Sequence, residues 1–216
     1  MSRGRFWVIE GMDGSGKSTQ AARLAADLHR LGRKVLAVRE PGATPLGERL
    51  RELLLHADRV ESPWQPRAEA LLFFAARVEL LARQIAPALA AGQDVLCERF
   101  SASTLAYQGQ EAADANFVLD LDRLCVPPDL QPSRVLILDL PAQESFERVR
   151  ADARRRGVRL DAIEARGLAF QERVRAGYLR YASHFPDRCT LLRVQGLDEN
   201  QVAASIQAAL GLEQRA

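Results

Sequence analysis

A glycine-rich loop near the start of the chain constrains the fold more than any other feature. Residues Gly11 to Ser18 read Gly-Met-Asp-Gly-Ser-Gly-Lys-Ser, one residue after the apolar run Phe6–Ile9. The residues that follow have helical periodicity, with Leu24 and Leu28 on one face. A strand, such a loop and a helix in this order form a phosphate-binding loop, in which backbone N–H groups and the helix dipole attract an anion. The sequence therefore predicts a nucleoside triphosphate site.

Composition favours a compact enzyme and excludes several other classes. A chain of 216 residues can bury one sizeable core, and its net charge of +2 is too small to indicate nucleic-acid binding. No apolar run approaches the length of a membrane span, and the start of the chain leads into a strand rather than a signal sequence. The three cysteines, Cys97, Cys125 and Cys189, suit neither a disulfide framework nor a metal site, so we expect a reducing cytoplasm.

Segments of strand and helix character alternate along the chain. The expected strands are Phe6–Glu10, Val35–Val38, Val95–Cys97, Val135–Leu138 and Leu191–Val194. The expected helices are Ser18–Leu31, Leu46–His56, Arg67–Ala91 with an early kink or end at Pro87, one from Ser103, Gln143–Arg155, one from Asp161 to about Ala182, and Asn200–Leu210. This alternation predicts an α/β fold, a doubly wound five-stranded parallel sheet with helices on both faces and ligands at the carboxyl ends of the strands. No interior linker divides the chain, so residues 1–216 are expected to form one domain.

The segment after the third expected strand indicates the class of phosphate-binding protein. It reads Glu-Arg-Phe-Ser-Ala-Ser-Thr-Leu-Ala-Tyr-Gln over residues 98–108, and the chain has no Asn-Lys-x-Asp element of a GTPase. Together with Arg39–Gly42, Phe73–Arg77 and the phosphate-binding loop, this segment resembles the thymidylate kinases in order and spacing. The resemblance covers nearly the whole chain. It implies that ATP and dTMP are converted to ADP and dTDP with Mg²⁺, in the synthesis of dTTP.

The arginine pattern supports such a reaction independently of the resemblance. A nucleoside monophosphate presents an ionised phosphate oxygen, so its phosphorylation needs cations and geometry rather than a general base. Arg39 and Arg99 each follow an apolar strand directly and are expected to lie at the catalytic edge. The alternative is that they are surface arginines paired with the neighbouring Glu40 and Glu98.

The resemblance also implies roles for single residues. Phe73 would stack on thymine, Arg77 would bond a base carbonyl, and Thr104 and Gln108 would face the pyrimidine edge, while one of Phe73 and Phe74 belongs to the core. The implied ATP site comprises Gly11, Met12, Asp13, Gly14, Ser15, Gly16, Lys17, Ser18 and Thr19. The implied substrate site comprises Arg39, Glu40, Arg51, Phe73, Arg77, Arg99, Thr104, Tyr107 and Gln108, with Tyr107 beside the deoxyribose.

Two acidic positions near the expected phosphate and metal site, Glu98 and Asp13, leave alternatives open. Lys17 would neutralise the donor phosphates, and Ser18 and Glu98 would serve Mg²⁺. Glu98 stands where most thymidylate kinases have aspartate, so it could instead orient Arg99. Asp13 resembles the family carboxylate near the sugar 3′-hydroxyl of the acceptor, but it could also only stabilise the loop turn.

A lid is predicted over residues 149–161. Residues 150–159 contain five arginines, whereas the variable positions of the phosphate-binding loop contain no basic residue. The lid is therefore expected to supply the catalytic arginine. Arg154 and Arg156 are the leading candidates, with Arg150 and Arg159 behind them. The alternative is a solvated basic helix end.

Other functions and the assembly remain open at this point. The chain could be a kinase for another deoxynucleotide or for a deoxynucleoside, or a P-loop binding protein without catalysis. Two departures from the family pattern leave open a protein without catalysis. They are Glu98 in place of the usual aspartate and Ala43 in place of the usual glycine. The resemblance implies a homodimer, for which Leu71, Leu72 and Leu80 could supply an interface if the core does not need them.

Overall fold

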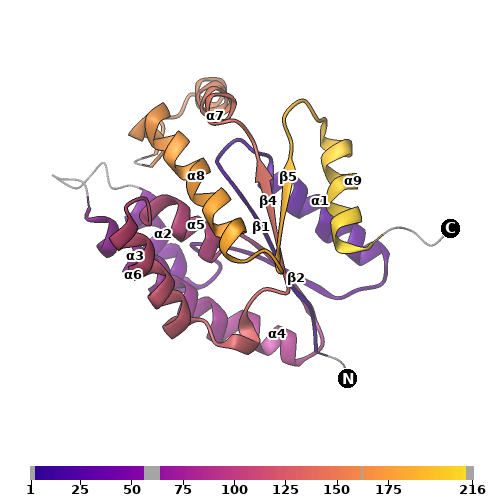
Figure 1. The fold of residues 1–216 in the computed structure, drawn as a ribbon. Coiled ribbons are helices and arrows are strands. Elements are labelled where there is room, and N and C mark those ends of the chain that lie inside the picture. Colours follow the sequence, from indigo (N-terminus) through magenta and orange to yellow (C-terminus); the bar gives the residue numbers. More distant parts are fainter. Residues whose placement is uncertain (1–2, 56–63, 162, 213–216) are drawn as a thin grey trace.

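The computed structural model describes residues 3–55, 64–161 and 163–212, and these residues contain a five-stranded parallel sheet. The strands are β1 (Phe6–Gly11), β2 (Val35–Arg39), β3 (Asp94–Glu98), β4 (Arg134–Asp139) and β5 (Cys189–Arg193). Their order across the sheet is β2-β3-β1-β4-β5, and every neighbouring pair is parallel. The predicted doubly wound α/β fold is confirmed (Figure 1).

The helices lie on both faces of this sheet. They are α1 (Lys17–Arg30), α2 (Pro45–Leu55), α3 (Pro66–Leu80), α4 (Ala86–Ala90), α5 (Ser101–Gln108), α6 (Ala112–Cys125), α7 (Ala142–Arg156), α8 (Leu168–His184) and α9 (Glu199–Leu210), with a π-helical turn η2 (Leu81–Ile85) and 3₁₀ turns η3 (Pro128–Leu130) and η4 (Glu164–Arg166). No helix in the described ranges is long and apolar enough to cross a membrane.

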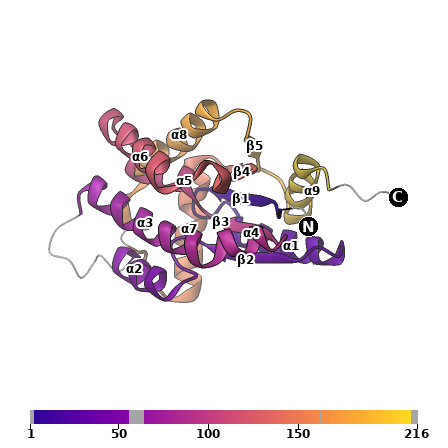
Figure 2. The same ribbon diagram turned by 90° about the horizontal axis from the view of Figure 1, so that it is seen from below.

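Alternating side chains of β1 divide the core into two layers. Trp7 and Ile9 pack with α1 and α9 on one face, and Phe6 and Val8 pack with α3, α4, α5 and α8 on the other. Figure 2 shows α9 beside α1, away from α2 and α3. Because both faces are covered, strands β1, β3 and β4 are almost continuously buried, as expected for central parallel strands.

The expected strands agree with the observed ones to within two residues, but three of the predicted helices differ. The helix expected over Arg67–Ala91 continues through Pro87, because the π turn η2 precedes α4 and Pro87 lies in the first turn of α4. A proline lacks the N–H for a regular helical bond, and a π turn accommodates such an interruption. The helix expected from Ser103 is two helices, α5 and α6, and the helix expected from Asp161 begins only at Leu168. The last residue of the helix predicted over Leu46–His56, His56, lies outside the described residues.

The carboxyl ends of the strands bring distant residues to one edge. Arg39 at the end of β2 lies opposite Glu98 at the end of β3, and Ile9 of β1 also pairs with Glu98. The chain turns from each of these strand ends into a helix, and α5 and α8 then lie against one another over the same face of the sheet. Glu98 and the phosphate-binding loop therefore meet at this edge.

We predict that Gly177→Ala destabilises the fold. A Cβ atom at Gly177 in α8 would lie 2.6 Å from Ala106 Cα in α5, so the two helices would have to separate. Overpacking of this kind costs about 1–3 kcal/mol, whereas the same exchange in an unrestricted helix stabilises by about 1 kcal/mol. A lower thermal midpoint is expected, and Ser183→Ala on the exposed side of α8 should change the midpoint little. A higher midpoint for Gly177→Ala would contradict the close packing.

Candidate active site

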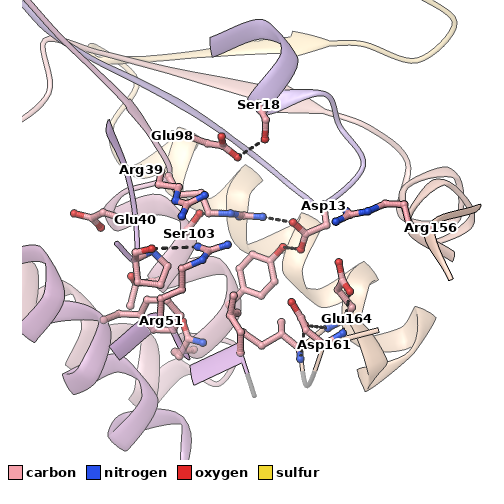
Figure 3. A pocket seen from close by; sticks show the side chains of 18 residues that line it. Asp13, Ser18, Arg39, Glu40, Arg51, Glu98, Ser103, Arg156, Asp161 and Glu164 are labelled. Carbon is pink, nitrogen blue, oxygen red and sulfur yellow. Dashed lines mark hydrogen bonds and ion pairs between the residues drawn. The ribbon is translucent and has the colours of Figure 1, made fainter. Parts of the chain in front are cut away.

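A pocket of about 360 Å³ opens at the carboxyl edge of the sheet. Its walls come from the phosphate-binding loop, the ends of β2 and β3, helices α2, α3 and α5, and the segment after α7 (Figure 3). The residues that line it are Asp13, Ser18, Arg39, Glu40, Pro41, Arg51, Leu55, Phe73, Glu98, Arg99, Ser103, Thr104, Tyr107, Gln108, Arg156, Asp161, Ile163 and Glu164. Most of the residues predicted for substrate and metal are therefore brought together.

The phosphate-binding loop has the local geometry of an anion site. Gly16 precedes α1 with φ 91°, a left-handed conformation that favours glycine, and no described side chain caps the helix. The space beside Gly16 is open, so an anion can approach the backbone closely. Lys17 follows it with its Nζ donating to Met12 O at 2.7 Å and lying 3.7 Å from Asp13 Oδ1.

Asp13 and Lys17 have opposite roles in the local charge balance. Burial opposes ionisation of Asp13, but the charges of Arg99 and Lys17 and a hydrogen bond from Tyr107 lower its pKa to about 2. Burial, together with the neighbouring Arg99 charge, lowers the pKa of Lys17 to about 8, against the attraction of Asp13 and Glu98. Asp13 is therefore ionised at neutral pH. Lys17 is protonated at neutral pH and loses its proton as the pH rises through about 8.

Arg99 lies at the centre of the site in a strained conformation. Its φ of 67° is left-handed although it carries a side chain, and its guanidinium pairs with Asp13. It also donates to Ser103 Oγ at 3.1 Å, to the Tyr178 hydroxyl at 3.1 Å and to Gly11 O at 3.3 Å. The sequence left open an ion pair between Arg99 and Glu98, but Arg99 pairs with Asp13 instead.

Glu10, a residue that sequence analysis did not select, holds the Arg99 segment in place. Its fully buried carboxylate accepts from the backbone N–H of Phe100 at 2.7 Å and of Ser103 at 3.1 Å, and from Ser103 Oγ at 2.6 Å. Burial raises the pKa of this carboxyl, and these hydrogen bonds oppose the rise. A carboxylate that ends a buried apolar strand was the signal available in the sequence.

Glu98 and Ser18 meet beside the phosphate-binding loop. Ser18 Oγ donates to Glu98 Oε1 at 2.9 Å, although Glu98 carries one methylene more than an aspartate would (Figure 3). Two hard oxygen ligands suit Mg²⁺, which keeps several waters and takes further oxygens from phosphates. The described residues contain no cluster of three or more metal-binding side chains, so this pair fits a phosphate-bound cation better than a closed protein site.

Two further cations face the pocket from β2 and α2. Arg39 is half exposed, and its Nη2 lies 3.4 Å from Glu48 rather than beside Glu40 or Glu98. Arg51 donates to Pro41 O at 3.1 Å and lines the pocket, whereas its neighbour Arg49 is exposed and does not. With Arg99, these side chains concentrate positive charge in one part of the pocket.

The chain is similar to thymidylate kinases over nearly its whole length. The thymidylate kinase family model matches residues 9–206. A thymidylate kinase of Caulobacter vibrioides is 45% identical over 195 residues, 89% of each chain, and one of Bordetella petrii is 42% identical over 100% of this chain and 97% of its own. A crystal structure of thymidylate kinase from Ehrlichia chaffeensis superposes with a TM-score of 0.75 at 30% identity, covering 97% of this chain and 99% of that one.

The chain belongs to the thymidylate kinase family. It phosphorylates dTMP to dTDP with ATP as the phosphoryl donor. These comparisons support neither of the two alternatives considered from the sequence. The first was a kinase for another deoxynucleotide or for a deoxynucleoside, and the second was an inactive nucleotide-binding protein.

The two phenylalanines of α3 have separate places in the kinase. Phe73 lines the pocket and Phe74 is in the core, so one of the pair is a core residue, as expected. Arg77 is only 1% exposed and lies behind the pocket wall, with Nη2 2.7 Å from Glu40 Oε2 and 2.9 Å from Thr104 Oγ1. Its Nη1 is buried and has no hydrogen-bond partner among the described residues.

Helix α5 supplies three predicted substrate residues of the kinase from its inner face. Thr104, Tyr107 and Gln108 are all buried and line the pocket. The Tyr107 hydroxyl donates to Asp13 Oδ2 at 3.0 Å, so the aromatic ring is tied to the phosphate-binding loop.

One of the four predicted lid arginines reaches the pocket. α7 ends at Arg156, before Gly157 in a left-handed conformation, and Arg156 lines the pocket and points toward Asp13 (Figure 3). Arg150, Arg154 and Arg159 do not line it.

Several contacts to the phosphate-binding loop were missed by sequence analysis. Ser145 Oγ in α7 donates to Asp13 O at 2.6 Å, and Arg148 donates to Gly14 O at 3.3 Å. Tyr178 of α8 donates to Gly11 O at 3.0 Å. No local pattern marks these residues, because they come from helices far away in the chain.

The backbone conformation at Ala43 explains why the thymidylate kinase family usually has glycine at this position. Its φ of 62° is in the left-handed region, which an alanine adopts at a cost. Its N–H donates to Glu48 Oε1 at 2.8 Å, and its carbonyl accepts from Gln84. These contacts hold the loop between β2 and α2 despite the side chain.

We predict that ATP affinity falls as pH rises through about 8. Lys17 is charged below its pKa of about 8 and neutral above it, and the charged form attracts phosphates. The dissociation constant of ATP should rise by about tenfold between pH 7.5 and pH 9 if the charged form alone binds well. Calorimetric titration measures this change. Lys17→Arg stays charged and should show a much flatter profile, and equal profiles for both proteins would contradict the assignment.

Proposed function

We propose that the described pocket is the dTMP site of this kinase and that the phosphate-binding loop holds the ATP phosphates beside it. The observation that carries this proposal is the position of Arg99. Its guanidinium joins Asp13 of the loop to the pocket that α3 and α5 enclose. A cation at this junction is close to both the donor and the acceptor phosphate, where negative charge accumulates during transfer.

The two ends of the pocket suit the two ends of a nucleoside monophosphate. Arg39, Arg51 and Arg99 offer cations to the acceptor phosphate, and no general base is needed because that phosphate is already ionised. Phe73, Thr104 and Gln108 offer a ring face and hydrogen-bonding groups to the base. Glu40 holds Arg77 behind this wall, and Tyr107 lies between the two ends, where a deoxyribose would sit.

The reaction proposed is a direct in-line transfer of the γ-phosphoryl group. Gly11, Met12, Gly14, Ser15, Gly16 and Thr19 belong to the loop and helix start whose backbone would surround the donor phosphates, and Lys17 would neutralise them. Ser18 and Glu98 would hold Mg²⁺ in this arrangement. The ion would neutralise charge on the phosphate oxygens and fix their geometry. Asp13 keeps Arg99 and Tyr107 in place and faces the acceptor.

Arg156 is the lid residue that we propose for catalysis. In the structure its Nη1 lies 3.3 Å from Asp152 Oδ2 on α7, and its side chain points into the pocket. A small movement of residues 149–161 would bring it onto the phosphates, so we infer that this segment is a mobile lid of one kinase domain. Arg154 is the second candidate.

A homodimer in the cytoplasm is the assembly that we propose. Of the three leucines named for the interface, Leu80 belongs to the core, while Leu71 is exposed. Leu71 lies beside the exposed Leu46 and Val78 in a shallow apolar depression between α2, α3 and α6, which a second copy could cover.

The acceptor specificity tests the function directly. A coupled ADP-release assay with ATP and Mg²⁺ is expected to show strong turnover of dTMP, weak turnover of dUMP and almost none of dCMP. Lys17→Ala should abolish release with every acceptor, because the donor phosphates lose their cation. Comparable turnover of all three monophosphates by the wild-type protein would overturn the proposed base site, and no turnover despite ATP binding would favour a regulatory protein.

Replacement of single lid arginines tests the catalytic assignment. Arg156→Ala should lower kcat by about 100-fold or more with a small change in KM, since an arginine that stabilises transition-state charge acts mainly on the chemical step. Arg155→Ala is the matched control, because Arg155 is exposed and does not line the pocket. A larger loss in Arg154→Ala than in Arg156→Ala would transfer the role to Arg154.

A further inference from the structure

The carboxylate of Glu69 connects the pocket wall to a residue outside it. Glu69 lies in the first turn of α3 and is only 6% exposed. Its Oε2 accepts from Gln108 Nε2 at 3.0 Å, and its Oε1 accepts from Arg166 of η4. Both oxygens of this carboxylate are therefore occupied by donors, one of which belongs to a residue that lines the pocket.

This contact determines which way the Gln108 amide faces. A carboxylate can only accept hydrogen bonds, so the NH₂ group of Gln108 must turn toward Glu69 and its oxygen must turn away. That oxygen, Oε1, is buried and has no hydrogen-bond partner among the described residues. A buried acceptor without a donor is unfavourable, and because Gln108 lines the pocket, a bound molecule whose N–H group reaches this oxygen would satisfy it.

We propose that Glu69 determines the base selectivity of the kinase by holding Gln108 as an acceptor toward the base, an inference that rests on the proposed dTMP site. Thymine and uracil carry an N–H donor at N3, which complements an amide oxygen. Cytosine carries a lone pair at N3, which an amide oxygen repels. A site built around one hydrogen-bonding group discriminates strongly against a ligand that leaves it unpaired.

Arg166 makes the effect of a conservative change predictable. An arginine side chain only donates, so in Glu69→Gln it would hold the oxygen of the introduced amide. The NH₂ group of that amide would then face Gln108. Gln108 would turn its oxygen toward this donor and present its own NH₂ group to the pocket, which complements the cytosine N3 lone pair.

The test is a comparison of dTMP, dUMP and dCMP with wild type and Glu69→Gln. The ratio of kcat/KM for dTMP to that for dCMP is expected to fall by about tenfold or more. The ratio for dTMP to dUMP is expected to stay the same, since both bases carry the N3 donor, and general damage to the site would lower turnover without this pattern. Calorimetric titration with the three monophosphates should show the same shift in affinity without relying on turnover.

Controls separate the inference from the proposed function. Arg166→Met leaves Glu69 as an acceptor for Gln108, so the dTMP to dCMP ratio should stay within about threefold. If Glu69→Gln does not fold, Glu69→Met frees the Gln108 amide and should bring the ratio toward unity. A selective wild type with an unchanged ratio in the Glu69 variant would overturn the role of Glu69 alone, whereas a wild type that does not select dTMP would overturn the dTMP site itself.

Discussion

The hydrogen bonds of Glu10 hold the rest of the active site together. This carboxylate lies one residue before the end of β1, next to the phosphate-binding loop, and accepts from the backbone N–H groups of Phe100 and Ser103 at the start of α5. The phosphate-binding loop and helix α5 are thereby joined through one buried group. An unpaired carboxylate at this depth would be strongly unfavourable, so the segment after β3 is restricted to the conformation that satisfies it. The left-handed backbone of Arg99 lies within this segment.

The charge distribution around Arg99 prepares the site for two anions. The cations are balanced by acidic neighbours, with Arg99 and Lys17 close to Asp13 and Arg39 close to Glu48. The Glu48 side chain is well exposed, so a phosphate can replace it as the partner of Arg39 without leaving a buried charge uncompensated. Groups held in position in this way need little reorganisation during transfer, which is the main source of catalysis in phosphoryl transfer.

Local patterns were sufficient for much of the fold, including the phosphate-binding loop and the strand and helix beside it. The strand, glycine loop and helix at residues 6–30 are continuous in sequence, so their geometry follows from local rules, and the structure confirms the strand and the helix. The expectation for the third helix was incomplete. Proline rules predict a kink or end at Pro87, whereas the observed interruption of the α-helix is the π turn η2 before it, in which Leu81 and Ile85 are buried in the core. The gap between Asp161 and Leu168 was missed for a similar reason, because η4 is held by Arg166 against Glu69 of a different helix.

The sequence by itself determined the family, the parallel α/β fold and most of the types of side chain that line the pocket. Each of these depends on motifs a few residues long or on the periodicity of apolar residues. Only the tertiary structure decided which charges meet. It paired Arg99 with Asp13 rather than Glu98, brought Arg156 to the pocket rather than Arg154, and placed Glu69 against Gln108. These contacts join residues from separate elements, and their free energies depend on distance and burial, which no local pattern records.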